Sequence, residues 1–134
     1  MPADRSPSRL LLGAIAAFLA LGAIPVGLAF VARPDGSLVG MPVAVLAGTP
    51  FRDFTVPGLV LALAVGGSTL AASVLVVRGS PGARRAALAA GVVVMGWIVV
   101  QVALIGALSA LQPVVGALGL AMVLLARRRR APGG

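Results

Sequence analysis

The side chains of this chain that could carry out chemistry are few and belong to a narrow range of types. The acids are Asp4, Asp35 and Asp53, every basic residue is Arg, and Lys, Glu, His, Tyr and Cys do not occur. General acid–base catalysis needs a group whose pKa lies near neutrality, and nucleophilic catalysis needs a nucleophile with an activating partner. Asp, Ser and Thr alone do not supply these groups, so we expect no enzyme and no catalytic residue.

Metal, cofactor and ion-coupled transport sites are disfavoured for the same reason. Without Cys and His the chain lacks disulfides and the ligands of the usual zinc sites. Asp35 and Asp53 offer two carboxylates, whereas Ca²⁺ takes about six to eight oxygen ligands. Ion-coupled carriers keep an ionisable group inside their membrane spans, and the long apolar stretches of this chain contain none. We therefore expect no metal and no cofactor.

The segment 33–56 is the one whose composition is not explained by crossing a membrane. Two interpretations of its four charges stay open. In the first, solvated ion pairs, for instance between Arg33 and Asp53, hold the two ends of the loop together. In the second, the segment is a docking surface for a partner protein or an anionic lipid head group. The residues of this docking surface are Arg33, Asp35, Phe51, Arg52, Asp53 and Phe54.

Within this loop, Thr49 and Pro50 have the order of a helix N-cap followed by a first helical residue. The order predicts a brief helical turn over residues 51–54. Phe51 and Phe54 are three residues apart, so in such a turn they share a face that dips into the membrane interface.

A second candidate site lies in the middle of an apolar stretch, at Gly66, Gly67, Ser68 and Thr69. A pair of glycines destabilises a helix and marks a bend or a close backbone contact. One interpretation is a crevice for a ligand or ion at the middle of the membrane. The other is a packing notch in which Ser68 and Thr69 bond to their own helix.

Trp97 and Gln101 form the last candidate, because a separation of four residues places them on one face of a helix. We expect Gln101 to bond across to another helix near Gln112, in preference to lining a polar path. Trp97 is expected to be a packing or interface residue.

The elements that must position these residues are membrane spans. The chain is 60% apolar, its mean hydropathy is +1.11, and its charges fall into clusters that leave four long uncharged stretches. An apolar run of about 20 residues spans a bilayer core of about 30 Å. We predict one all-α membrane domain, an antiparallel four-transmembrane-helix bundle, with spans at 10–32, 57–77, 86–107 and 108–126. The outer loop is 33–56, the inner loop 78–85 and the basic tail 127–134.

The first span could be mistaken for a signal peptide, but it is long and no small-x-small cleavage site ends it, so we expect a retained helix. Small residues four apart are expected to bring the spans into close contact. These pairs are Gly13 with Ala17, Ala23 with Gly27, Ala62 with Gly66, Gly67 with Ala71, and Ala117 with Ala121.

The orientation follows from the distribution of Arg. Nine of the eleven flank the spans on one side, and positively charged flanks face the cytoplasm. Both termini are then cytoplasmic and the loop 33–56 faces outward. The juxtamembrane Arg residues lack interleaved aromatics, so they predict contact with anionic lipid and no nucleic acid. These topology anchors include Arg78, Arg84, Arg85, Arg127, Arg128, Arg129 and Arg130. The bias toward Ala, Val, Gly and Arg is typical of a GC-rich bacterial genome, which indicates a bacterial plasma (inner) membrane.

The loop contains the phrase Gly40-Met41-Pro42 followed by Gly48-Thr49-Pro50-Phe51-x-Asp53-Phe54-x-x-Pro57-Gly58-Leu59. Two later segments, Gly96-Trp97-Ile98-Val99-x-Gln101 and Leu111-Gln112-Pro113, follow in order. In these features the chain resembles a group of uncharacterised small bacterial four-span integral membrane proteins that share a GMPxxxLxGTPFxDFxxPGL outer-loop motif. The resemblance implies the four-span topology and draws attention to the loop, but it implies no catalytic residue.

By elimination, the leading functional hypothesis is a noncatalytic accessory or stabilising subunit of a larger membrane complex. The alternative is a homo-oligomeric passive pore or a lipid-binding and lipid-handling membrane protein. The expected partners are membrane lipids, including anionic head groups, together with another membrane protein or further copies of this chain.

Overall fold

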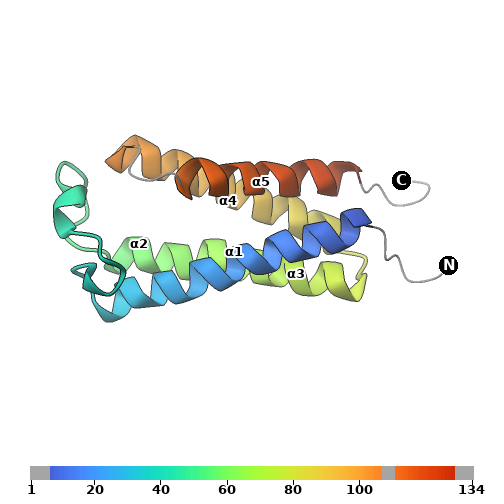
Figure 1. The fold of residues 1–134 in the computed structure, drawn as a ribbon, viewed down its shortest axis with the longest axis horizontal. Helices are drawn as coiled ribbons and strands as arrows, with labels where there is room; N and C mark the ends of the chain where they lie inside the picture. The colour runs from blue at the N-terminus through green and yellow to red at the C-terminus, as the bar shows by residue number, and fades with distance from the viewer. Residues whose placement is uncertain (1–6, 107–110, 129–134) are drawn as a thin grey trace.

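A computed structural model describes residues 7–106 and 111–128, and this part of the chain is all-helical with no strand. Helix α1 (Pro7–Ala32) is followed by a second rod made of α2 (Thr55–Val60), the π-helical segment η3 (Leu61–Gly66) and α3 (Gly67–Arg78). The chain then continues into α4 (Ala83–Ile105) and α5 (Leu111–Arg128). The four rods lie side by side and alternate in direction (Figure 1). The predicted all-α fold is therefore confirmed.

The two ends of this arrangement differ. The start of α1, the end of α5 and the α3–α4 turn lie together at one end, here called the terminal end (Figure 1). The opposite end, here called the loop end, carries the long connection between α1 and α2. That connection contains two short 3-10 helices, η1 (Ser37–Val39) and η2 (Val43–Leu46).

Three of the rods are long and apolar enough to cross a membrane, namely Arg9–Ala32, Thr55–Arg78 and Ala83–Leu104, with hydropathies of 2.2 to 2.4. At 1.5 Å per residue each of them exceeds a hydrocarbon core of about 30 Å. The fourth apolar stretch, Gln112–Arg127, is shorter. The predicted start of the fourth span at residue 108 lies outside the described residues.

The second rod begins at Thr55 rather than at the predicted residue 57. Asp53 explains the earlier start, because its Oδ1 accepts a hydrogen bond of 3.0 Å from the Thr55 N–H. This bond satisfies one of the N–H groups that a helix start leaves unpaired.

Glycines allow the closest approaches between the helices. A Cβ on Gly27 of α1 would lie 2.6 Å from both the Ala62 nitrogen and the Gly58 oxygen of the second rod. A Cβ on Gly91 of α4 would lie 2.9 Å from the Gly119 oxygen of α5. Such backbone contacts are possible only without a side chain, so these two crossings depend on glycine. Gly91 and Gly119 were not among the predicted small-residue pairs.

Two of the predicted pairs lie toward the surface of the described chain. Gly67 has no neighbouring atom within 4 Å of its Cβ position, and Ala71 and Ala117 are exposed. Alanine is so frequent in this sequence that the spacing alone does not select the faces that pack.

Arg side chains cap the last turns of two helices, α3 and α5, at the terminal end. Arg9 Nε donates to the Val76 carbonyl at 2.8 Å, and its Nη2 donates to the Val77 carbonyl. Arg84 Nε donates to the Ala126 carbonyl of α5 at 3.1 Å. A cation that bonds the last carbonyls of a helix satisfies unpaired acceptors and opposes the negative end of the helix dipole. Arg84, predicted only as a topology anchor, therefore also holds α4 to α5.

The tightest core lies toward the terminal end. Ala72, Ala87, Ala90, Val94 and Met122 are fully buried there, and they join α3, α4 and α5. Beyond Val94 no described residue of α4 is buried. Helix α4 therefore diverges from the second rod toward the loop end, and the candidate site lies in the space between these two rods.

Candidate functional site

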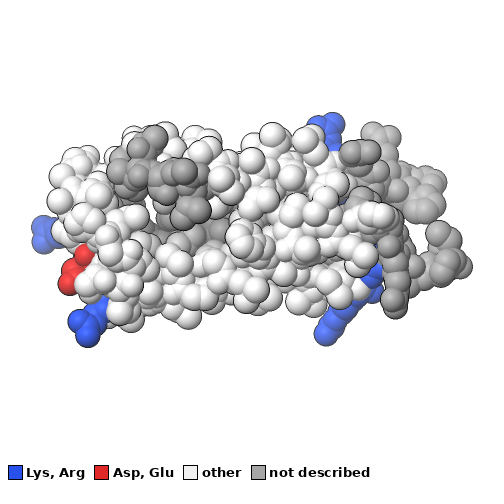
Figure 2. Space-filling view, viewed as in Figure 1, with Lys and Arg blue, Asp and Glu red and all other residues white. Residues whose placement is uncertain are grey.

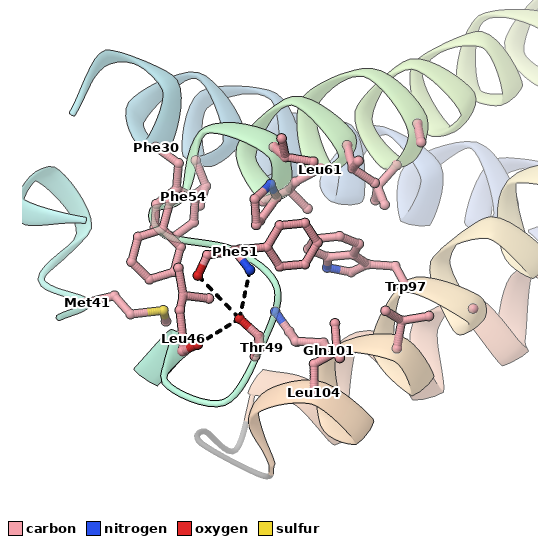
Figure 3. A pocket seen from close by; sticks show the side chains of 18 of the residues that line it. Phe30, Met41, Leu46, Thr49, Phe51, Phe54, Leu61, Trp97, Gln101 and Leu104 are labelled. Atoms are coloured by element: carbon pink, nitrogen blue, oxygen red, sulfur yellow. Dashed lines mark hydrogen bonds between the residues drawn. The ribbon is translucent and has the colours of Figure 1, made fainter. Parts of the chain in front are cut away.

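The site is a cavity of about 570 Å³ between the second rod and α4, beneath the loop. Its walls come from α1, from the π-helical part of the second rod and from one face of α4 (Figure 3). On α4 the lining residues recur at helical spacing from Val93 through Trp97 and Gln101 to Leu104. A single stripe of α4 therefore faces the cavity.

The π-helical segment η3 forms the opposite wall through Leu61, Ala64 and Val65. Beside it, a Cβ on Gly66 would lie 2.4 Å from Ile24 Cγ1, so α1 packs directly against this glycine. Single π-turns inside α-helices shift the direction of the side chains that follow and occur often at functional sites. Here the wider turn coincides with the cavity wall.

The predicted mid-membrane crevice at residues 66–69 is not part of this cavity. Gly66 packs on α1, and the Ser68 hydroxyl donates to the Val65 carbonyl at 3.2 Å. The Thr69 hydroxyl also donates to the Val65 carbonyl, at 2.7 Å, and is fully buried. These hydroxyls bond to their own helix, and the cavity lies one turn nearer the loop.

The loop closes over the cavity through an aromatic pair. The rings of Phe30 and Phe54 stack with their centroids 4.6 Å apart at an interplanar angle of 23°. Leu46 is buried in the same cluster. The backbone N–H of Phe54 donates to the Pro34 carbonyl at 2.9 Å, which joins the beginning and the end of the loop.

This arrangement corrects the prediction that Arg33 and Asp53 hold the loop ends together. Neither residue forms an ion pair in the described part of the chain. Asp53 instead accepts the Thr55 bond, and Asp35 Oδ1 accepts a bond of 2.9 Å from the Ser37 N–H. Buried aromatic contact replaces charge pairing because the loop carries enough apolar side chains to form a small core of its own.

The predicted helical turn over residues 51–54 is also wrong. The Thr49 hydroxyl donates to the Leu46 carbonyl at 2.7 Å and accepts the Phe51 N–H at 3.2 Å, which makes a side-chain-stabilised bend (Figure 3). Phe51 and Phe54 consequently turn inward and line the cavity. With Phe54 only 3% exposed, it is not available as an anchor for a partner, whereas Arg52 stays exposed.

The polar side chains of α4 and α5 meet beside the cavity. Gln112 is buried, and its Nε2 donates to Gln101 Oε1 at 3.1 Å and to the Gly106 carbonyl at 3.2 Å. The predicted bond between Gln101 and Gln112 is therefore present. It links the loop-end part of α4 to the start of α5 and directs the Gln101 Nε2 group away from Gln112.

None of the described residues that line the cavity is charged. The charged side chains of the loop lie on the outer surface of the loop. There the Ser37 backbone N–H and the nearby Arg33 guanidinium lower the pKa of Asp35 below its ordinary value of 3.8. Among the described residues, no group of three or more His, Cys, Asp or Glu side chains could hold a metal. Within the described part of the chain, the polar side chains that reach the cavity are Thr49, Trp97 and Gln101.

No protein-family model, curated protein or solved structure matches this chain. The interpretation of the site therefore depends on its geometry. Sequence reasoning selected Trp97, Gln101, Phe51 and Phe54, but it did not bring them together. A usable signal was present in the loop, where Met41 and Leu46 are too apolar for a segment exposed to water.

Proposed function

We propose that this protein is a noncatalytic multi-pass membrane protein that binds a lipid-like apolar molecule in its loop-end cavity. The observation that carries the proposal is the cavity itself. Its volume of about 570 Å³ falls within the range of about 300 to 1,000 Å³ typical of small-molecule sites. Its lining is almost wholly aliphatic and aromatic, so the chemistry that fits it is hydrocarbon.

The membrane setting is supported by the distribution of charge. Figure 2 shows Arg side chains toward both ends of the molecule and Asp side chains at the loop end, with a long uncharged surface between them. Large apolar side chains such as Phe18, Leu21 and Leu63 are more than 60% exposed on that surface. A soluble monomer rarely exposes so much contiguous apolar area, whereas a lipid-facing surface requires it.

The finer topology belongs to the same proposal. An even number of spans, four, puts both termini on the same side of the membrane. The Arg-rich terminal end makes this the cytoplasmic side of the plasma membrane of a bacterial cell. Helix α5 has 18 residues, which gives a length of about 27 Å, so the bilayer thins slightly around it or α5 stops short of the outer interface. The cavity then lies at the level of the outer leaflet.

Val60 of the second rod and Leu104 of α4 line the cavity, and each is about 40% exposed. The proposal places the entrance between these two rods. The exposed lining faces the region where lipid chains lie in the proposed topology. A molecule dissolved in the bilayer can therefore enter sideways without crossing the water layer, and the loop covers the site from above.

The test measures which small molecules remain bound to the protein after purification in mild detergent. Gly96 lines the cavity and has no atom within 4 Å of its Cβ position. Gly96→Leu therefore adds a bulky side chain at the cavity lining, and its Cβ meets no other helix. Gly67→Leu is the matched control, because Gly67 also has an unobstructed Cβ position but does not line the cavity.

We expect the native protein and the Gly67→Leu variant to retain an apolar molecule in near-stoichiometric amount, and Gly96→Leu to lose most of it. Equal retention by all three proteins would refute the proposal. A stoichiometric protein partner in place of a lipid would return the accessory-subunit hypothesis to first place. A homo-oligomer whose solute flux Gly67→Leu abolishes would favour the pore.

A further inference from the structure

The cavity presents two hydrogen-bond donors that have no acceptor within it. Trp97 Nε1 has no hydrogen-bond partner among the described residues, and Gln101 is bonded only through its Oε1 atom, to Gln112. No fully buried side-chain nitrogen or oxygen in the described part of the chain lacks a partner. These two N–H groups therefore border open space and not packed side chains.

The orientation of the Gln101 amide follows from its neighbour. Gln112 Nε2 also donates to the Gly106 carbonyl, which fixes Gln112 as the donor of the pair. Gln101 must then present its oxygen to Gln112 and its nitrogen elsewhere. In Figure 3 the Gln101 amide nitrogen lies on the cavity side of α4, beside the Thr49 bend.

The third polar group of the lining does not satisfy these donors. The Thr49 oxygen accepts the Phe51 N–H and gives its own proton to the Leu46 carbonyl, so one acceptor lone pair remains, and neither Trp97 nor Gln101 donates to it. Among the polar side chains of the described lining, donors therefore outnumber free acceptors. In an apolar environment an N–H group without a partner is costly, and a ligand that supplies an acceptor removes that cost.

We infer that the ligand of this cavity is an uncharged apolar molecule with a carbonyl oxygen, which Gln101 Nε2 and Trp97 Nε1 bind. A carbonyl has two lone pairs and no proton, so it matches two donors. A hydroxyl would bring a further donor to a lining whose described side chains already offer more donors than free acceptors. An anion is disfavoured because no cation is among the described residues that line the cavity. This inference depends on the proposed function and specifies its ligand.

The carbonyl could belong to the ester of a lipid or to the ring of a quinone, since both join a neutral acceptor to a hydrocarbon chain. Two pairs of probes separate these sources. The ester pair is methyl tetradecanoate and pentadecane, and the ring pair is decylbenzoquinone and decylbenzene. Each probe is titrated into the full-length protein in detergent, and the bound fraction is measured by native mass spectrometry.

We expect the carbonyl member of at least one pair to bind about tenfold more tightly than its hydrocarbon partner. Gln101→Leu and Trp97→Phe should each reduce that preference by about five- to tenfold, the usual effect of one hydrogen bond. Neither variant should weaken binding of the hydrocarbon. Leu104→Val, at a cavity position with no donor, should change both members of a pair alike.

The outcomes separate the inference from the proposal beneath it. If both members of each pair bind equally and Gly96→Leu abolishes binding, the carbonyl inference is overturned and the apolar site stands. If Gly96→Leu leaves binding of every probe unchanged, the proposed function fails as well. A preference confined to one pair identifies the ester or the ring as the source of the carbonyl.

Discussion

Gly27→Ala tests the closest approach of one helix to the backbone of another among the described residues. The added Cβ would lie 2.6 Å from two backbone atoms of the second rod, the Ala62 nitrogen and the Gly58 oxygen. An ordinary contact begins at 3.4 Å, so α1 must move away by somewhat less than 1 Å. Backbone atoms cannot rotate out of the way as a side chain can, and the movement therefore affects the whole crossing.

The size of the effect follows from two opposing terms. Overpacking costs about 1 to 3 kcal/mol, and two backbone clashes place Gly27 near the upper value. Alanine favours the helix over glycine by about 1 kcal/mol. We expect a net destabilisation of about 2 kcal/mol, which changes the unfolding equilibrium about thirtyfold. Phe30 and Leu61 lie on either side of this crossing and line the cavity, so ligand retention should fall in parallel.

The assay is equilibrium unfolding of the purified protein in mixed micelles, followed by far-ultraviolet circular dichroism and by the fluorescence of Trp97, the single tryptophan. Gly22→Ala is the matched control, because it lies in the same helix with no atom within 4 Å of its Cβ position. It should stabilise the protein by up to about 1 kcal/mol. If both substitutions stabilise equally, α1 does not cross the second rod in backbone contact, and the reasoning is refuted.

Three further predictions concern the loop and the terminal end. Phe54→Ala should release the loop, and limited proteolysis within residues 40–53 should become at least tenfold faster, whereas the exposed Phe18→Ala should leave the cleavage rate unchanged. Arg9→Leu should destabilise the protein by about 1.5 to 3 kcal/mol, the range for hydrogen bonds to charged groups. The reason is that the substitution leaves carbonyls at the end of α3 without their donor. Replacing the exposed Arg78 should have little effect in the same unfolding assay. The Asp35 carboxylate should titrate below 3.8 when followed by NMR, because the Ser37 N–H stabilises its charged form. Its small stabilising effect should therefore be complete above pH 3.8 and disappear as the pH falls through the lower folded-state pKa; a titration at or above 3.8 would contradict this.

The helices were predictable because their cause is local. Long uncharged stretches bounded by Arg and by Pro and Gly define rods whatever their neighbours are, and the three longest rods lie where the sequence placed them. The bond between Gln101 and Gln112 was predictable for a related reason. An isolated amide in an apolar stretch requires a partner, and a short connection brought the two residues close in space.

The loop was harder to predict because its alternatives are close in energy. Thr49 before Pro50 suits a helix N-cap as well as a bend, and local sequence does not distinguish them. The bend is selected by contacts made elsewhere. Burial of Phe54 against Phe30 of α1 stabilises the inward arrangement, whereas exposed ion pairs such as the predicted one between Arg33 and Asp53 contribute little energy.

The sequence by itself determined the kind of protein: an all-helical chain with apolar rods and with charges confined to the ends of the rods and to the segments between and beyond them. It also determined what chemistry is absent, because no packing can create a His, Cys or Glu that the chain does not contain. The tertiary structure decided where the rods touch and where they separate. Gly27 and Gly91 permit close crossings, and the departure of α4 beyond Val94 leaves the cavity open. Such a cavity arises from the relative positions of residues far apart in sequence, which periodicity and composition do not specify.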